Sequence, residues 1–120
     1  NAIQFARLCP YVIGVEIEAH KIKKAEHNSG IYHVNHKIDL IHADFFSLKK
    51  LFADVVFLAP TELATENFEK FSLQKHLSPD LKQLIKHSLT LSRSLCLMLP
   101  ASTNFEELAS VFCSIFEENP

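Results

Sequence analysis

Hydrophobic residues along the chain fall into short continuous runs, separated by stretches in which they recur at helical spacing. Short apolar runs between turn signals are typical of buried strands in a parallel sheet. The sequence predicts four such strands, at residues 12–17, 37–42, 53–60 and 94–99. The run at 53–60 is the clearest, and we expect it to be central in the sheet.

The stretches between the first strands predict helices. Residues 1–8 read as the body of a helix that ends before Pro10, because the residue preceding a proline avoids helical geometry. A second helix is expected at 19–28, with Ile22 and Ala25 facing inward and Gly30 just past its end. Residues 47–52 predict a short helical turn.

The C-terminal half predicts a loop and two amphipathic helices. The polar segment 61–78 reads as a loop with one helical turn near 66–71. Ser78 is expected to cap the next helix, with Pro79 in its first turn. The apolar face of that helix is predicted to comprise Leu81, Leu84, Ile85 and Leu89.

The last helix is predicted to begin with a capping box, in which Thr103 and Glu106 each satisfy a free amide at the helix start. Glu117 and Glu118 oppose the helix dipole at its other end and indicate a frayed terminus. The side chains expected to face inward are Phe105, Leu108, Phe112, Ile115 and Phe116.

Strands and helices in this order predict an α/β fold with a parallel sheet and right-handed crossovers. A length of 120 residues is that of one domain. The hydrophobic fraction of 48% and ten phenylalanines fit a packed interior, and no apolar run approaches the roughly 18 residues of a membrane helix. We expect no signal peptide in these residues.

The first strand ends in an acid, Glu16, and runs straight into the next helix. A branched apolar strand that ends in a carboxylate is typical of the ribose-binding corner of nucleotide-binding α/β folds, where the two oxygens can accept hydrogen bonds from both ribose hydroxyls. An acid that only caps the next helix gives the same pattern. In dinucleotide-binding folds such an acid lies roughly 20 residues after a glycine-rich loop. Counted back from Glu16, that loop would lie just before Asn1.

The overall charge does not favour nucleic-acid binding, because the chain has 12 basic and 14 acidic residues and a formal net charge of -2. The lysines near 21–24 and 49–50 are expected on solvated surfaces. Only two glycines occur, so no glycine-rich phosphate loop is present in these residues. The cysteines Cys9, Cys96 and Cys113 indicate small buried hydrophobic groups in a reducing intracellular compartment.

The histidine-rich segment before and within the second predicted strand is a weak metal candidate. His33 and His36 could join Asp39 or His42, but the segment has no cysteine partner and solvated histidines are the preferred interpretation. The sequence therefore predicts no metal site.

Five stretches resemble the trimethylguanosine synthase family, which comprises S-adenosylmethionine-dependent RNA cap guanine-N2 methyltransferases. The resemblance is strongest over residues 1–60 and is carried by 1–6 (Asn-Ala-Ile-Gln-Phe-Ala), 12–18, 43–45, 53–60 and 97–101. It implies a single partial methyltransferase domain over 1–120, of the Rossmann-like S-adenosylmethionine-dependent fold. The fold would be incomplete, with its first strand and C-terminal hairpin not included.

The resemblance also implies a donor-binding site for S-adenosyl-L-methionine. Glu16 matches the acid that holds the donor ribose, where the family usually has Asp. Asp44 matches the acid near the adenine amino group, with Phe45 beside the ring, and Asn1 matches the end of the glycine-rich donor motif. For Asp44 alone, a helix-capping role is the alternative.

The chain departs from the family at the catalytic step. The family follows its fourth strand with Ser-Pro-Pro-Trp, where the turn holds the guanine amino group and the Trp stacks on 7-methylguanine. This chain has Ala59-Pro60-Thr61-Glu62-Leu63, so only Pro60 remains as a candidate catalytic residue. No Trp occurs in the chain; Tyr11, Phe68 or Phe71 could stack instead, although packing roles are favoured.

Three functions follow as hypotheses. The first is conversion of the 7-methylguanosine caps of small nuclear or nucleolar RNA to 2,2,7-trimethylguanosine, in the nucleus or cytoplasm, with weak or no activity from this chain alone. The second is a degenerate domain of the same fold that binds a partner or cofactor without catalysis. The third is methylation of another nucleobase. The sequence predicts no oligomeric state.

Overall fold

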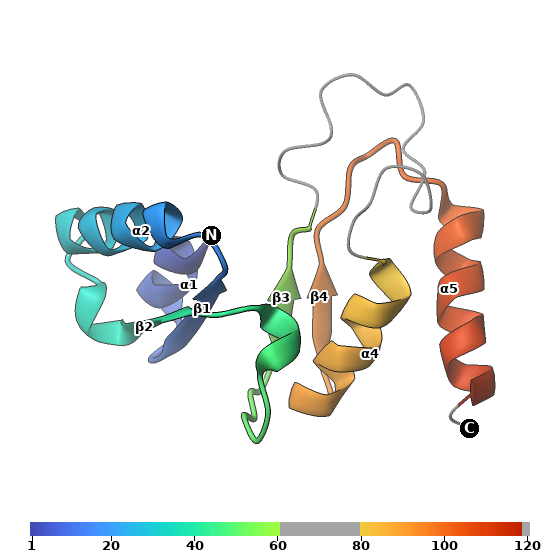
Figure 1. Cartoon of the computed structure of the whole chain (residues 1–120). Helices are drawn as coiled ribbons and strands as arrows, with labels where there is room; N and C mark the ends of the chain where they lie inside the picture. The colour runs from blue at the N-terminus through green and yellow to red at the C-terminus, as the bar shows by residue number, and fades with distance from the viewer. Residues whose placement is uncertain (61–79, 119–120) are drawn as a thin grey trace. The chain divides into compact units, whose positions relative to one another are not determined.

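The computed structural model describes residues 1–60 and 80–118, which divide into two compact units (Figure 1). Unit 1 is Asn1–Leu48 and unit 2 is Lys49–Pro120. Each unit contains a pair of parallel strands with helices packed against it, so the predicted mixed α/β character with parallel strands is confirmed. The predicted loop at 61–78, with Ser78 and Pro79, lies outside the described residues.

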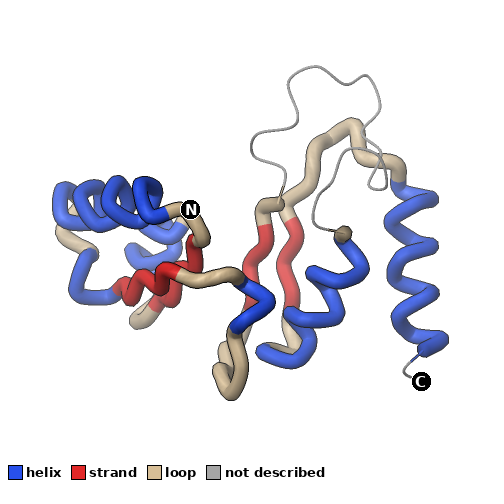
Figure 2. Tube along the Cα trace, in the orientation of Figure 1, coloured by secondary structure: helices blue, strands red, loops and turns tan. Residues whose placement is uncertain are grey.

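Unit 1 is built around two parallel strands that run in step over their whole length. Val12 lies opposite Ile38 at one end, and Glu16 lies opposite His42 at the other. Figure 2 shows the helical segments in blue and the strands in red. In chain order the elements are α1 (Ala2–Leu8), β1 (Val12–Glu16), α2 (Ala19–Ile31), the 3₁₀ turn η1 (Asn35–Lys37), β2 (Ile38–His42) and the 3₁₀ turn η2 (Phe45–Ser47).

The core of unit 1 forms where α1 meets the strands. Ala6, Val34 and Ile38 are buried, and Val12 and Leu40 pack against them. Gly14 in β1 permits this close packing, because a Cβ at that position would lie 3.0 Å from Cδ2 of Leu40. The glycine therefore serves the packing of one strand pair.

Two predicted boundaries in unit 1 are wrong. Helix α2 continues through Gly30 to Ile31, and the backbone turns at His33, which has a φ of 57°. The helical turn expected at 47–52 is absent from these described residues, and a 3₁₀ turn lies earlier, at Phe45–Ser47. Its position follows from Asp44, whose carboxylate accepts a hydrogen bond from the Phe46 amide.

Unit 2 contains β3 (Val56–Leu58), α4 (Leu81–Leu91), β4 (Leu95–Leu97) and α5 (Phe105–Glu118). The two strands are parallel and shorter than predicted. Residues before Val56 leave the ladder because they bond to the last residue of α4 and to the residue after it. The Ala53 amide donates to the Leu91 carbonyl, and the Ser92 hydroxyl donates to the Asp54 carbonyl.

The core of unit 2 lies between α4, α5 and the end of β4. Leu81, Ile85 and Ile115 are its buried centre. The half-buried side chains packed against this centre are Leu95, Leu97, Leu99, Leu108, Val111 and Phe112. Burial of apolar side chains at a helix pair is the main force that stabilises such a unit.

Each helix of unit 2 is capped by the side chain of the residue that precedes it. Asp80 is the N-cap of α4, and its carboxylate accepts a hydrogen bond from the Lys82 amide at 3.2 Å. At α5 the cap is Asn104, whose Oδ1 accepts from the Glu106 amide at 3.0 Å. Thr103 is buried and donates its hydroxyl to the Pro100 carbonyl, so the predicted capping box is wrong.

Several apolar side chains in unit 2 that were expected to be buried are exposed. In β4 the exposure alternates, so Cys96 is exposed between the half-buried Leu95 and Leu97. The other exposed side chains are Val55, Leu89, Met98, Phe105, Cys113 and Phe116. In unit 1, Cys9 is exposed as well.

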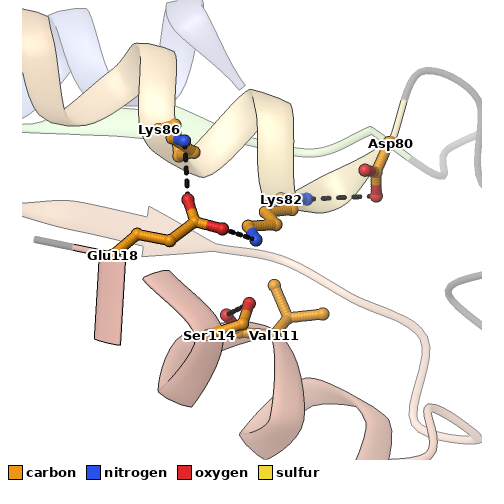
Figure 3. Close-up of polar contacts among 6 residues, drawn as sticks. All are labelled: Asp80, Lys82, Lys86, Val111, Ser114 and Glu118. Carbon is orange, nitrogen blue, oxygen red and sulfur yellow. Dashed lines mark hydrogen bonds and ion pairs between the residues drawn. The ribbon is translucent and has the colours of Figure 1, made fainter. Parts of the chain in front are cut away.

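The end of α5 is held by an ion-pair cluster (Figure 3). Lys82 and Lys86 lie one turn apart on α4, and both donate to the carboxylate of Glu118, at 2.5 and 2.9 Å. These hydrogen bonds, that of Lys82 first, lower the pKa of Glu118 from 4.5 to about 2. The fraying predicted at Glu118 is therefore wrong, because its side chain joins the two helices.

This cluster predicts an acid-sensitive contact between α4 and α5. Since the folded pKa of Glu118 is lower than its ordinary 4.5, the contact stabilises fully above pH 4.5 and is lost as the pH falls toward 2. We expect a carboxyl NMR titration to place the Glu118 midpoint near 2, and the Lys82→Ala, Lys86→Ala double variant to move it toward 4.5. Because these groups are exposed, high salt should reduce the difference. A midpoint that is the same with and without the lysines would contradict the cluster.

Candidate functional site

The candidate site lies where β1 and β2 end at a common edge of the unit 1 sheet. Glu16 and His42 are the last paired residues, and the Ala43 amide donates to the Glu16 carbonyl at 3.1 Å. Parallel α/β sheets bind ligands at the carboxyl ends of their strands. The residues that follow each strand, including the predicted Asp44 and Phe45, are thus brought to this edge.

Glu16 is half-buried, and a backbone amide orients its carboxylate. Its Oε1 accepts a hydrogen bond from the Glu18 amide at 3.1 Å. Within residues 1–60 and 80–118, its Oε2 makes no hydrogen bond. A carboxylate can accept about four hydrogen bonds, so most of its acceptor capacity is still open.

Glu16 and Glu18, the acid at the start of α2, make different contacts. Glu18 is the N-cap residue, and its own side chain makes no capping hydrogen bond. The Glu18 carboxylate pairs with Lys21, and the hydrogen bond from Lys21 lowers the pKa of Glu18. Glu16 is not the N-cap residue, but its carboxylate accepts from the Glu18 amide, one of the free amides at the helix start, so the local role considered from the sequence is present.

Asp44 is exposed and stands at the start of η2. Its Oδ1 accepts from the Phe46 amide at 3.0 Å, which is the capping role considered from the sequence. Its backbone carbonyl accepts from the Ser47 hydroxyl at 2.6 Å. One carboxylate oxygen is thus fixed by the turn, and Oδ2 makes no hydrogen bond within the described part of the chain.

Phe45 follows Asp44 and is half-buried. Its ring packs edge-on against Phe46, with the centroids 5.8 Å apart and the planes at 65°. Edge-to-face packing of this kind restrains both rings. An aromatic face beside an acid is suited to a flat heterocycle that carries an amino group.

Asn1 occupies the N-cap position of α1 and is exposed. Its carbonyl accepts from the Phe5 amide at 3.0 Å, and its side chain makes no capping bond. Helix α1 packs against both β1 and β2, so Asn1 belongs to the same unit as Glu16 and Asp44.

The predicted acceptor side lies elsewhere in the chain. Pro60 belongs to unit 2, is half-buried and comes shortly after β3 ends. Phe68 and Phe71 lie outside the described residues. Tyr11 precedes β1, at the opposite end of the strand from Glu16, and its hydroxyl donates to the Asp39 carboxylate, which raises the pKa of Tyr11. Tyr11 therefore does not join the acids at the strand ends.

His42 also lies at this edge, although the sequence predicted only a solvated histidine there. Its Nε2 lies 3.0 Å from the carbonyl oxygen of Ile17, just beyond the last residue of β1. The signal available in the sequence was its position, because it ends the strand that pairs with the one ending at Glu16.

Neither a metal site nor a membrane span is found in the described residues. Over 1–60 and 80–118, no three His, Cys, Asp or Glu side chains are arranged to hold a metal ion. None of the helices in those ranges combines the length and apolar character needed to cross a membrane.

The strand-end acids suit the donor groups of a nucleoside. Ribose hydroxyls and an adenine amino group donate hydrogen bonds, and Glu16 and Asp44 each have one backbone-fixed oxygen and one open oxygen. The adenosyl part of S-adenosylmethionine carries both kinds of donor. The residues present therefore fit the cofactor that the family resemblance implies.

Comparison with known proteins extends the match to the whole chain. The family model for RNA cap guanine-N2 methyltransferases matches residues 1–120. Trimethylguanosine synthase from Schizosaccharomyces pombe is 33% identical over an alignment of length 119; the match covers 92% of this chain and 49% of that protein. The chain thus spans about half the length of the curated relative it matches. The protein belongs to the RNA cap guanine-N2 methyltransferase family.

Proposed function

We propose that the chain binds S-adenosylmethionine at the carboxyl ends of β1 and β2, as the donor-binding part of an RNA cap guanine-N2 methyltransferase. The observation that carries the proposal is the pair of acids at this edge, each with one oxygen held by a backbone amide two residues later. Carboxylates held in this way need little reordering when a ligand binds, so less entropy is lost.

The proposed roles follow the hydrogen-bonding capacity of each group. Glu16 accepts from the ribose hydroxyls, Asp44 accepts from the adenine amino group, and Phe45 lies against the ring. Asn1, at the start of α1, contacts the amino-acid end of the donor. When bound, the cofactor supplies an electrophilic methyl group. The fold proposed is the Rossmann-like S-adenosylmethionine-dependent methyltransferase fold, the finer form of the mixed α/β fold.

The acceptor proposed is the guanine amino group of a 7-methylguanosine cap on small nuclear or nucleolar RNA, encountered in the nucleus or cytoplasm. The family match favours this acceptor over another nucleobase. Methyl transfer depends chiefly on positioning, with the reacting atoms near 3 Å and in line. Of the family motif that does this positioning, the chain retains Pro60.

A second candidate function is a domain that binds the donor or a partner without catalysis. The replaced motif favours it, because Ala59 has no hydroxyl and Glu62 cannot stack on a base as an indole does. The two candidates agree on the donor site and differ only in the acceptor step.

Two measurements on the chain test these proposals. We expect calorimetric titration with S-adenosylhomocysteine to give a saturable heat, since Glu16 and Asp44 each have an open carboxylate oxygen. We expect radiolabelled methyl transfer to a 7-methylguanosine cap analogue to remain at or near background. No heat at millimolar ligand would overturn the donor site. Robust transfer would overturn the binding-only candidate and show that the changed motif still supports catalysis.

A further inference from the structure

The turn that leaves β1 contains one peptide group held from both sides. The carbonyl of Ile17 and the amide of Glu18 belong to the same planar peptide, in which oxygen and hydrogen point in opposite directions. His42 Nε2 lies 3.0 Å from that oxygen, and the Glu16 carboxylate accepts from that amide at 3.1 Å. Rotation of this one plane would break both hydrogen bonds.

The chemistry of these groups fixes which of them donates. A carbonyl oxygen can only accept, so the His42 Nε2 must carry a proton and donate it. A hydrogen bond to the oxygen of a peptide polarises the group and strengthens donation from its amide. The bond from His42 therefore favours the orientation in which the Glu18 amide points at the Glu16 carboxylate.

The position of His42 explains why a side chain is needed for this task. Backbone pairing between β1 and β2 stops with the Ala43 amide on the Glu16 carbonyl, so the next carbonyl, that of Ile17, has left the ladder. The His42 side chain comes from the residue opposite Glu16 and extends the contact between the two strands by one peptide.

We propose that His42 is a positioning residue of the donor site, which holds the Ile17–Glu18 peptide so that the Glu16 carboxylate is presented to the donor ribose. His42 acts through Glu16 and does not touch the donor. The effect of His42 on cofactor binding rests on the proposed function. The effect of His42 on the Glu16 carboxylate does not, because it can be measured in the protein without ligand.

The test uses two substitutions at one position and a matched control. His42→Leu removes the N–H group that donates to the Ile17 carbonyl. His42→Gln retains an N–H group at a similar distance from the backbone. His27→Leu makes the same chemical change on the exposed surface of α2. Circular dichroism of all three variants establishes that the fold is kept, and NMR amide exchange at Glu18 reports the bond to Glu16 without any ligand.

We expect His42→Leu to speed exchange of the Glu18 amide about three- to tenfold, which is the range for loss of one hydrogen bond. The Kd for S-adenosylhomocysteine should rise by a similar factor. His42→Gln should restore both values, and His27→Leu should change neither. In a Glu16→Ala background, His42→Leu should raise the Kd no further, because the two residues act through one contact.

The outcomes separate this inference from the proposed function. Unchanged Glu18 exchange in His42→Leu would overturn the inference, whether or not the donor binds. Faster exchange with an unchanged Kd would overturn the role of His42 in donor binding. Additive effects of the Glu16 and His42 substitutions would overturn action through Glu16. Absence of binding to the unsubstituted chain would overturn the proposed function itself, and the donor-site role with it.

Discussion

Replacing Glu16 by alanine is expected to weaken binding of S-adenosylhomocysteine by at least about 100-fold. The substitution removes the proposed acceptor for both ribose hydroxyls, and each hydrogen bond to a charged group contributes about 1.5–3 kcal/mol. Loss of two such bonds at the lower value is about 3 kcal/mol, or two factors of ten in the dissociation constant. Calorimetric titration measures this constant directly.

Glu18→Ala is the matched control for this prediction. It removes a carboxylate two residues away that is already paired with Lys21, while the Glu18 backbone amide is retained. We expect its Kd to change by less than about twofold, because exposed ion pairs contribute little. Equal losses in the two variants would point to a general charge effect and would contradict a specific ribose contact. Asp44→Ala should give a smaller loss than Glu16→Ala, since it removes one proposed bond.

The strands of unit 1 could be predicted well because their signal is local. Residues 12–17 and 37–42 differ from β1 and β2 by one residue at one end each. Parallel strands buried between other elements give continuous apolar runs that turn residues interrupt. In unit 2 the same signal overestimates both strands, because residues 53–55 have apolar neighbours but bond outside the ladder.

Helix caps and helix faces were predicted less well, for physical reasons. Thr103 and Asn104 are adjacent residues that can both cap, and only the backbone geometry selects Asn104. The choice also shifts which residues face inward. Phe105 and Phe116 are as hydrophobic as Phe112, yet only Phe112 lies on the face that meets the core. Residue type alone does not tell which side of the helix faces the core.

The acids of the candidate site could be found from sequence because each follows a predictable strand end. His42 could not be assigned in the same way, since its contact depends on the orientation of the Ile17–Glu18 peptide. That orientation is set by the turn into α2, and no residue pattern specifies it. The sequence also presented Asp44 as a choice between two roles. The structure shows that capping uses one oxygen and leaves the other open.

Replacing Ile85 by alanine is expected to destabilise unit 2 by about 2–5 kcal/mol. Ile85 is fully buried in α4, in the cluster it forms with Leu81 and Ile115. Truncation removes apolar contacts and leaves a cavity that a packed helix pair can close only in part. Urea unfolding followed by circular dichroism should show a lower midpoint with a similar slope.

Leu89→Ala is the matched control on the same helix. The sequence assigned Leu89 and Ile85 to one apolar face, whereas 45% of Leu89 is exposed in the structure. A side chain that is half in water in the folded state loses little burial when truncated, so we expect a cost below about 1 kcal/mol. Similar costs for the two variants would mean that α4 is rotated from its observed position. A large difference would establish Ile85 as the centre of the contact with Ile115 in α5, and so would test the helix packing that the sequence could not specify.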